Sequence, residues 1–153
     1  MKKSKRFFAA LLAVMLISAL TVIPASAAGA DIQPYNNHTD VKFHFRFAGG
    51  NWVTPFREKE DKSSVYMNCE YADAEYTARV EACKNGGVPT SGKVDVSHGY
   101  RYTFETNTVR FMLSWAKEYG DEHNWPTTYA GIVGIPSKTS AYDAIGLWSP
   151  DSI

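Results

Sequence analysis

The histidines are the side chains best suited to acid–base or metal chemistry in this chain, and there are four: His38, His44, His98 and His123. Asp95 and His98 form a D-x-x-H pair, while Asp121 and Glu122 directly precede His123. Imidazole and carboxylate groups can bind transition metals, but neither cluster has the paired spacing of a zinc motif such as H-E-x-x-H. We therefore expect no metal site and no cofactor.

Motifs for nucleophilic, phosphoryl and glycosyl chemistry are missing from the sequence. It contains no G-x-S-x-G elbow, and its NGG sequence at 85–87 lacks the spacing of a phosphate-binding loop. Two carboxylates, Glu70 and Glu81, occupy positions expected to face outward from strands, and nothing pairs them as sugar hydrolysis requires. The sequence favours a protein that is not an enzyme.

Aromatic residues give the positive signal for binding. Four of them are expected in or beside loops, near the ends of strands: Trp52, Trp125, Trp148 and Tyr129. Exposed aromatic rings at such places stack on sugars or anchor a protein partner. The alternative is that a small domain uses these rings to fill the margins of its core. We predict a binding surface that contains these four residues.

The chain also contains two cysteines, Cys69 and Cys83, whose thiols could react. An even number of cysteines in an exported protein favours a disulfide, so we predict that these two are bonded. A tight hairpin between 64–71 and 76–83 would leave them about five residues apart, or roughly 17 Å, which is too far for a disulfide. The prediction therefore requires a wide loop between the two segments.

The elements that must position these residues are predicted to be strands. The clearest is Val41–Phe47 (VKFHFRF), in which apolar and polar residues alternate strictly, as in a strand with one buried face. Alternation also favours Tyr76–Cys83 as a strand, although its good helix formers leave a helix open. Val109–Trp115 is expected as a strand with residues 109, 111, 113 and 115 on its apolar face, and a helix is again the alternative.

The remaining segments complete an all-β picture. Further strands are expected at 64–71, 93–97, 100–106, 130–135 and 144–148, while 119–129 is rich in turn residues. The run of six charges at 57–62 indicates a solvated hairpin tip or edge, with a cation or partner site as the alternative. Seven or eight short strands predict an antiparallel β-sandwich or barrel formed by a single domain over 41–153.

The N-terminus has the features of a secretory signal peptide over residues 1–27. A basic start is followed by an apolar run and by Ala25-Ser26-Ala27, small residues that a signal peptidase recognises. An uncleaved membrane anchor is the alternative. Cleavage predicts a secreted domain with no membrane span, preceded by a flexible segment at 28–40. That domain contains 12 basic and 16 acidic residues, a net charge of −4, which disfavours nucleic-acid binding.

Three segments resemble small secreted proteins of Gram-positive, Firmicutes-type bacteria that form an uncharacterised domain family. They are the signal MKKSKRFFAALLAVMLISA, the segment Arg57–Met67 with its K-x-D-K-S-S-V-Y-M ending, and the tail Gly146–Ser152, which contains WSPDS. The resemblance implies export and a small β-domain, and it implies no catalytic residues.

These observations lead to one functional hypothesis and one rival. The hypothesis is a secreted, non-catalytic binding protein whose partner is cell-wall glycan, another envelope component or a protein. The rival is a bacteriocin-like or toxin-related secreted factor, which would kill related cells.

Overall fold

The computed structural model describes residues 37–152. The predicted signal peptide at 1–27 and most of the predicted flexible segment at 28–40 lie outside the described residues. Residues 37–40 belong to no strand or helix and lead directly into the first strand. Within the described part of the chain, no helix is long and apolar enough to cross a membrane.

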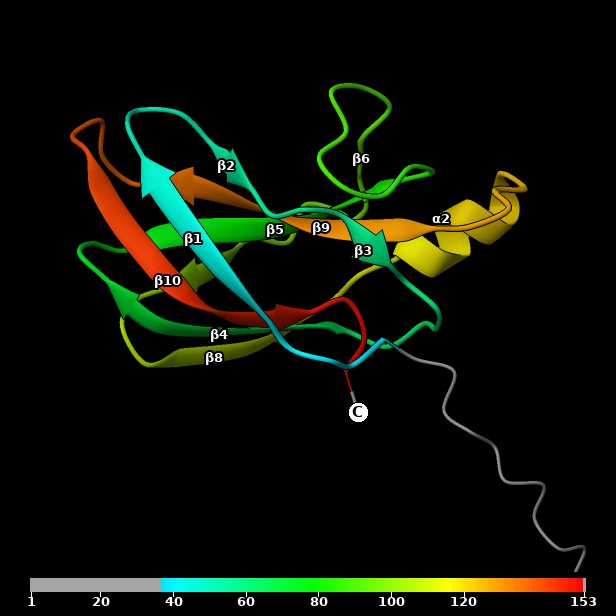
Figure 1. Cartoon of the computed structure of the whole chain (residues 1–153), viewed down its shortest axis with the longest axis horizontal. Coiled ribbons are helices and arrows are strands. Elements are labelled where there is room, and N and C mark those ends of the chain that lie inside the picture. Colours follow the sequence, from blue (N-terminus) through cyan, green and yellow to red (C-terminus); the bar gives the residue numbers. More distant parts are fainter. Residues whose placement is uncertain (1–36, 153) are drawn as a thin grey trace, which may run out of the picture. The chain divides into compact units, whose positions relative to one another are not determined.

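Two antiparallel sheets pack face to face, which confirms the predicted β-sandwich (Figure 1). The first, sheet A, has the strand order β1 (Val41–Phe47), β10 (Tyr142–Ser149), β4 (Val65–Ala72) and β8 (Thr108–Met112). The second, sheet B, has the order β2 (Trp52–Val53), β9 (Tyr129–Pro136), β5 (Tyr76–Cys83) and β6 (Val94–Asp95). In addition, β3 (Arg57–Glu58) pairs with β9, and β7 (Tyr102–Phe104) pairs with β5. The described residues thus form ten strands; the two-residue strand β6 falls within the strand predicted at 93–97, whereas β2 and β3 had not been predicted as strands.

The strand β1 has the predicted bounds and supplies the centre of the core. Phe43, Phe45 and Phe47 are buried, whereas the polar residues between them are exposed. The ring of Tyr76 from sheet B meets Phe45 edge-on at 5.8 Å between centroids and stacks on Phe104 at 5.5 Å. Aromatic contacts of this kind add to the area that the rings bury, so the two sheets are joined by an aromatic layer.

The strands β4 and β5 are consecutive in the chain but lie in different sheets. Residues 76–83 are a strand, as predicted, and not a helix. Because the chain crosses from one sheet to the other between Ala72 and Tyr76, no hairpin forms there. Cys69 belongs to β4 and Cys83 ends β5, and each is a free, buried thiol.

The predicted disulfide is therefore absent from the described residues. Cys69 lies three residues before the crossing and Cys83 seven residues after it, so the two are offset by about four residues, or roughly 13 Å, along the strands, whereas disulfide-bonded residues have Cα atoms roughly 4.4–6.8 Å apart. Each thiol instead meets a backbone carbonyl: Cys69 Sγ lies 3.5 Å from Tyr71 O and Cys83 Sγ lies 3.9 Å from Ser91 O.

Two predictions for the segment 108–129 were wrong. The strand β8 exists, but the face carrying Val109, Phe111 and Leu113 is exposed, and Thr108 and Met112 are the buried residues. After it, Ala116–Glu122 forms the helix α2, part of which had been assigned to turns. Gly120 lets this helix approach the chain closely, because a Cβ at that position would lie 1.7 Å from Thr128 Oγ1.

Candidate functional site

The four aromatic residues predicted to form a binding surface are not brought together. Trp52 lies on β2 with 39 % of its surface exposed, and Tyr129 begins β9 half-buried. Trp125 follows α2 and packs its ring edge-on against Tyr119, at 5.3 Å between centroids. Trp52 and Trp125 line separate pockets, so the structure offers no continuous platform that contains all four.

The predicted exposure of Trp148 is wrong. This side chain is completely buried, because β10 is an interior strand and Trp148 is paired with Val41 on one side and Met67 on the other. The guanidinium of Arg57 lies 5.6 Å from the centroid of its ring, within the range of a cation–π interaction. Trp148 is therefore a core residue, as the alternative interpretation of the aromatic residues held.

The histidines and carboxylates considered for chemistry are also dispersed. His44 faces Asp143 at 3.4 Å on the surface, while His98 stacks on Trp115 and His123 on Tyr119. Among residues 37–152, no three His, Cys, Asp or Glu side chains are placed to hold one metal ion.

The two carboxylates considered for sugar hydrolysis lie in different sheets. Glu70 is exposed on β4. Glu81 on β5 is buried rather than outward-facing, and its carboxylate lies 2.6 Å from Arg79 Nη2. The structure does not bring them together as a pair.

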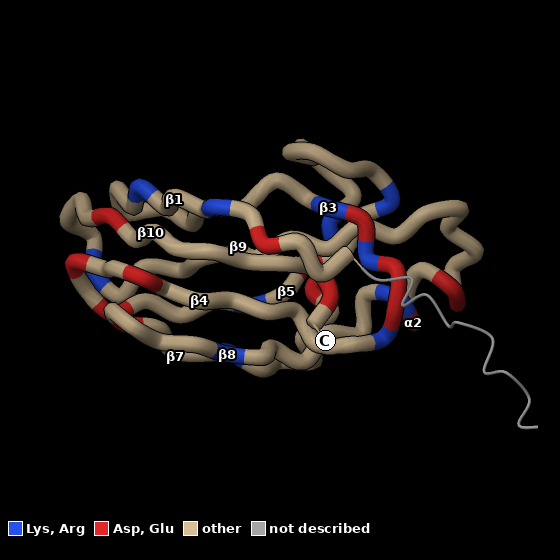
Figure 2. The backbone as a smooth tube through the Cα atoms, turned by 60° about the horizontal axis from the view of Figure 1, so that its bottom comes forward, with Lys and Arg blue, Asp and Glu red and all other residues tan. Residues whose placement is uncertain are grey.

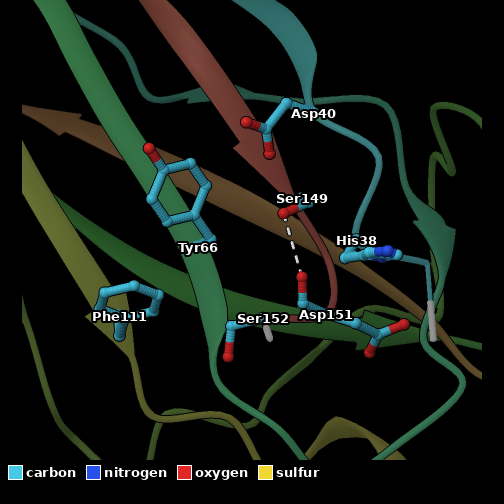
Figure 3. A pocket seen from close by; sticks show the side chains of 7 residues that line it. All are labelled: His38, Asp40, Tyr66, Phe111, Ser149, Asp151 and Ser152. Atoms are coloured by element: carbon cyan, nitrogen blue, oxygen red, sulfur yellow. Dashed lines mark hydrogen bonds between the residues drawn. The ribbon is translucent and has the colours of Figure 1, made fainter. Parts of the chain in front are cut away.

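A pocket of about 190 Å³ opens where the first and last described segments meet sheet A (Figure 3). Its lining combines two aromatic rings with hydroxyl, carboxylate and imidazole groups: Tyr66, Phe111, Ser149, Ser152, Asp40, Asp151 and His38. Tyr66 on β4 is paired with Phe111 on β8, and their ring centroids are 5.5 Å apart. This wall of the pocket is thus a cross-strand aromatic pair on the outer face of sheet A.

Within the described residues 37–152, neither serine that lines this pocket is hydrogen-bonded to a side chain that could act as its general base. Ser149 donates its hydroxyl hydrogen to the backbone carbonyl of Asp151 at 3.0 Å, as the dashed line in Figure 3 marks. Ser152 donates its backbone N–H to Ser63 Oγ at 2.9 Å. Among the described residues, no hydrogen bond joins His38 to either serine of this pocket.

Behind the pocket lies a completely buried ion pair. Lys59 Nζ and Asp151 Oδ1 are 2.5 Å apart, and neither side chain exposes any surface. The other carboxylate oxygen, Asp151 Oδ2, accepts the backbone N–H of Asn37 at 2.5 Å and that of Glu60 at 3.2 Å. The segment 57–62 had been predicted to be solvated, and for Lys59 that prediction is wrong.

Two further groups complete the surroundings of Lys59. Its Nζ donates to Asp61 Oδ1 at 3.1 Å and to Ser63 Oγ at 3.3 Å. Burial alone would raise the pKa of Asp61. Hydrogen bonds from Ser63 and Lys59, together with the charge of Lys59, outweigh this effect and lower the pKa to about 2. Asp61 is therefore an ionised carboxylate throughout the physiological range of pH.

The outer face of sheet A carries an apolar patch beside the pocket. We define this patch by residues of β4, β8 and β10 and by Leu113, which follows β8: Tyr66, Val109, Phe111, Leu113 and Leu147. Phe111 is the most exposed residue of the patch, at 58 %. Across the sheet, the outward residues Lys42, His44 and Arg46 make the β1 edge basic, and Figure 2 shows the Lys and Arg positions of β1 in blue.

Sequence reasoning missed both the apolar patch and the buried ion pair. Phe111 had been placed on the apolar face of its strand, with no indication that this face is exposed, and Lys59 and Asp151 lay in segments interpreted as solvated or as a tail. No local signal pairs Lys59 with Asp151, because 92 positions separate them in the chain.

Comparison with known proteins identifies a family but no relative of known function. A family model described as "Protein of unknown function (DUF2712)" matches residues 24–152, which covers all of the described residues. No curated protein and no solved structure matches the chain.

Proposed function

Because this chain belongs to the DUF2712 family, whose members have no assigned activity, we propose its function from the sequence and the site: a secreted, non-catalytic protein that binds a protein of the cell envelope. The observation that carries the proposal is the apolar patch on sheet A. Its members Val109, Phe111 and Leu113 expose 44, 58 and 43 % of their surfaces on one edge of the sandwich. A gathering of large apolar side chains on a soluble domain is typical of an interaction site.

The chemistry of the patch favours a protein partner over a glycan. Sugars stack on flat aromatic rings, and Tyr66 with Phe111 would suit them. Val109, Leu113 and Leu147, however, are aliphatic, and burying aliphatic surface is a main source of affinity between proteins. An aliphatic patch around an aromatic pair therefore fits a partner that also presents apolar side chains.

The position of β8 adds a second argument. It is the last strand in the hydrogen-bonded order of sheet A, so one side of its backbone is not paired with another strand among the described residues. A strand edge of this kind can accept an extended segment of a partner, with the partner's side chains meeting the patch in alternation. The basic residues of β1 favour carboxylates on the part of the partner that reaches across the sheet.

Export is supported by the N-terminal sequence. A basic start, an apolar run and Ala25-Ser26-Ala27 are the features that a secretion system and a signal peptidase recognise. A protein released in this way would meet its partner outside the membrane.

The test is co-sedimentation of the purified exported form with Gram-positive cell walls and with intact cells, with viability counted in parallel. We expect the protein to pellet with walls, and we expect protease treatment of the walls to abolish pelleting. Phe111→Ser should weaken pelleting at least tenfold, as the loss of a central apolar anchor does. Tyr100→Ser is the matched control, because Tyr100 is a ring of similar exposure, 51 %, that lies outside the patch.

The other outcomes separate the alternatives. Pelleting that survives protease treatment would identify glycan as the partner. Pelleting accompanied by loss of viability would favour the bacteriocin-like factor. Failure to pellet with any wall or cell preparation would contradict an envelope partner altogether.

A further inference from the structure

We propose that Lys59 and Asp151 condense to form an amide bond between their side chains, which cross-links the segment after β3 to the C-terminal tail. The geometry points to this reaction because an amine and a carboxyl group are held 2.5 Å apart, at Nζ and Oδ1, in a place that water does not reach. The carboxyl carbon is one bond beyond Oδ1. The nitrogen is thus close to the roughly 3–3.5 Å separation of a reactive conformer.

The buried charges supply a driving force. Removing an ammonium and a carboxylate from water is unfavourable, and their attraction repays that loss only in part. The amide is neutral, so its formation removes both buried charges. Holding the two groups together also replaces a bimolecular reaction by an intramolecular one, for which effective concentrations are very high. In this site, condensation is favoured in a way that it is not for the same groups in solution.

The surroundings provide a group for each proton and for the developing charge. The Lys59 ammonium gives one proton to Asp151 Oδ1, which leaves a neutral amine beside a neutral carboxyl group. The nitrogen then attacks Asp151 Cγ. Asp61 Oδ1, 3.1 Å from Lys59 Nζ, accepts the second proton from the nitrogen as it attacks. The backbone N–H groups of Asn37 and Glu60, which already donate to Asp151 Oδ2, stabilise the negative charge on that oxygen.

The reaction balances without any other reagent. The bond between Asp151 Cγ and Oδ1 breaks, and this oxygen leaves as water after it receives two protons. One proton comes directly from the Lys59 ammonium, and the other is passed on by Asp61. The net change is that one ammonium and one carboxylate become one amide and one water molecule, with no change in net charge and no oxidation or reduction. Asp61 ends as it began, as a carboxylate.

An exposed pair in the same protein serves as the internal comparison. Lys117 Nζ and Asp121 Oδ1 also form a close ion pair, but it lies on the surface of α2, where both groups are partly exposed. Both charges there keep part of their contact with water, and among the described residues no pair of backbone N–H groups donates to the Asp121 carboxylate. We expect this second pair to remain ionic, which distinguishes the proposed reaction from a general reaction of close lysine–aspartate pairs.

The experiment is a tryptic peptide map of the full chain, purified and unfolded before digestion. Trypsin cuts after lysine and arginine, so an unmodified protein yields cleavage after Lys59 and a linear peptide 139–153. The cross-linked protein instead yields one species in which peptide 58–62 is joined to peptide 139–153, lighter than their sum by one water molecule. Fragmentation in the mass spectrometer places the bond at Lys59 and Asp151.

Variants assign the roles of the groups. Lys59→Arg keeps a positive charge but cannot form this amide, so the cross-linked species should be lost. Asp61→Asn should slow its appearance in freshly purified protein at least tenfold, because the proton acceptor is gone. Lys117→Arg is the matched control and should leave the cross-link intact.

The tryptic peptide map of the wild-type protein shows whether the cross-link forms, even if a variant fails to fold. Complete cleavage after Lys59, with peptide 139–153 recovered in its linear form from protein stored folded for days, would overturn the proposal. The pair would then be an ordinary buried salt bridge.

Discussion

Removing only Asp151, which leaves the Lys59 charge buried without its carboxylate, should destabilise the fold more than removing both charges of the pair. Two variants test this: Asp151→Ala, which leaves the Lys59 ammonium buried, and the double variant Lys59→Met/Asp151→Ala, which leaves no charge there. Neither variant can form the amide, so the comparison is independent of whether the wild-type protein is cross-linked. Both lose the acceptor for the N–H groups of Asn37 and Glu60, so that loss cancels.

The expected difference follows from the surroundings of Lys59. Breaking a buried ion pair by removing one partner destabilises a protein by about 3–5 kcal/mol, whereas replacing both partners by apolar groups is often neutral or stabilising. In the Asp151→Ala variant, the ammonium keeps Asp61 as a partner at 3.1 Å, and that side chain is one-third exposed. We therefore take the lower end of the range and expect the double variant to be the more stable by about 3 kcal/mol.

Urea unfolding measures this difference directly. With a denaturant dependence of roughly 2 kcal/mol per molar urea, 3 kcal/mol corresponds to a midpoint about 1.5 M higher for the double variant. Asp121→Ala, which removes the partner of the exposed Lys117, should cost only about 0.3–0.5 kcal/mol and serves as the control. Equal midpoints for Asp151→Ala and the double variant would refute the argument that an isolated Lys59 charge is buried.

Three further predictions follow from burial and charge. Phe45→Ala should cost about 3–5 kcal/mol and Phe111→Ser less than about 0.5 kcal/mol, because only the first ring is in the core; urea unfolding that showed equal losses would contradict this. In protein whose Lys59 has not condensed with Asp151, the folded-state pKa of Asp61, about 2, lies below its ordinary value of 3.8, so its stabilisation is complete above about pH 4 and is lost as the pH falls through 2. Asp61→Asn should therefore remove about 1 kcal/mol of the stability that depends on pH in the acid range, after allowance for solvent screening. If the free energy of unfolding fell in parallel for wild type and variant between about pH 4 and about pH 2, this prediction would be contradicted. The thiols of Cys69 and Cys83 should resist a thiol reagent in the folded protein and both react after unfolding without reductant, whereas no reaction in the unfolded protein would reveal a disulfide.

The parts of the fold that sequence predicted are those whose local pattern matches their surroundings. In β1, each phenylalanine meets the core and each polar residue meets water, so the alternation gave both the strand and its buried face. The same reasoning gave β5, with its bounds. Here a strand prevailed over residues with good helix propensity, because pairing with β9 along its whole length decides the structure.

The strand β8 shows why the same pattern failed elsewhere. Alternation gives the period of a strand, but the choice of buried face depends on what the strand packs against. In β8, the more apolar face, with Val109 and Phe111, points outward from an edge strand. The helix α2 was missed for a different reason: its seven residues include Gly120 and follow directly on aromatic residues, so its local helix signal is weak.

The candidate site lay beyond sequence reasoning because distant residues build it. Lys59 is in a run of charges that would be solvated if it stood alone, and its burial depends on a carboxylate 92 positions later. Trp148 resembled a loop aromatic near the chain's end, but β10 is flanked by β1 and β4, which bury it. Pairings of this range are set by the topology of the sheets and not by any local window of sequence.

The segment Arg57–Met67 and the tail Gly146–Ser152, which carried the family resemblance in the sequence, contact each other in the structure. Lys59 and Ser63 of the first segment bond to Asp151 and Ser152 of the second. Asp151 also holds the backbone N–H of Asn37, so the segment before β1 is fixed at the same point. These residues therefore close one end of the sandwich, and their charges are used inside the protein and not offered to a ligand. A partner must then be recognised by what remains exposed beside them, which is the apolar patch around Phe111.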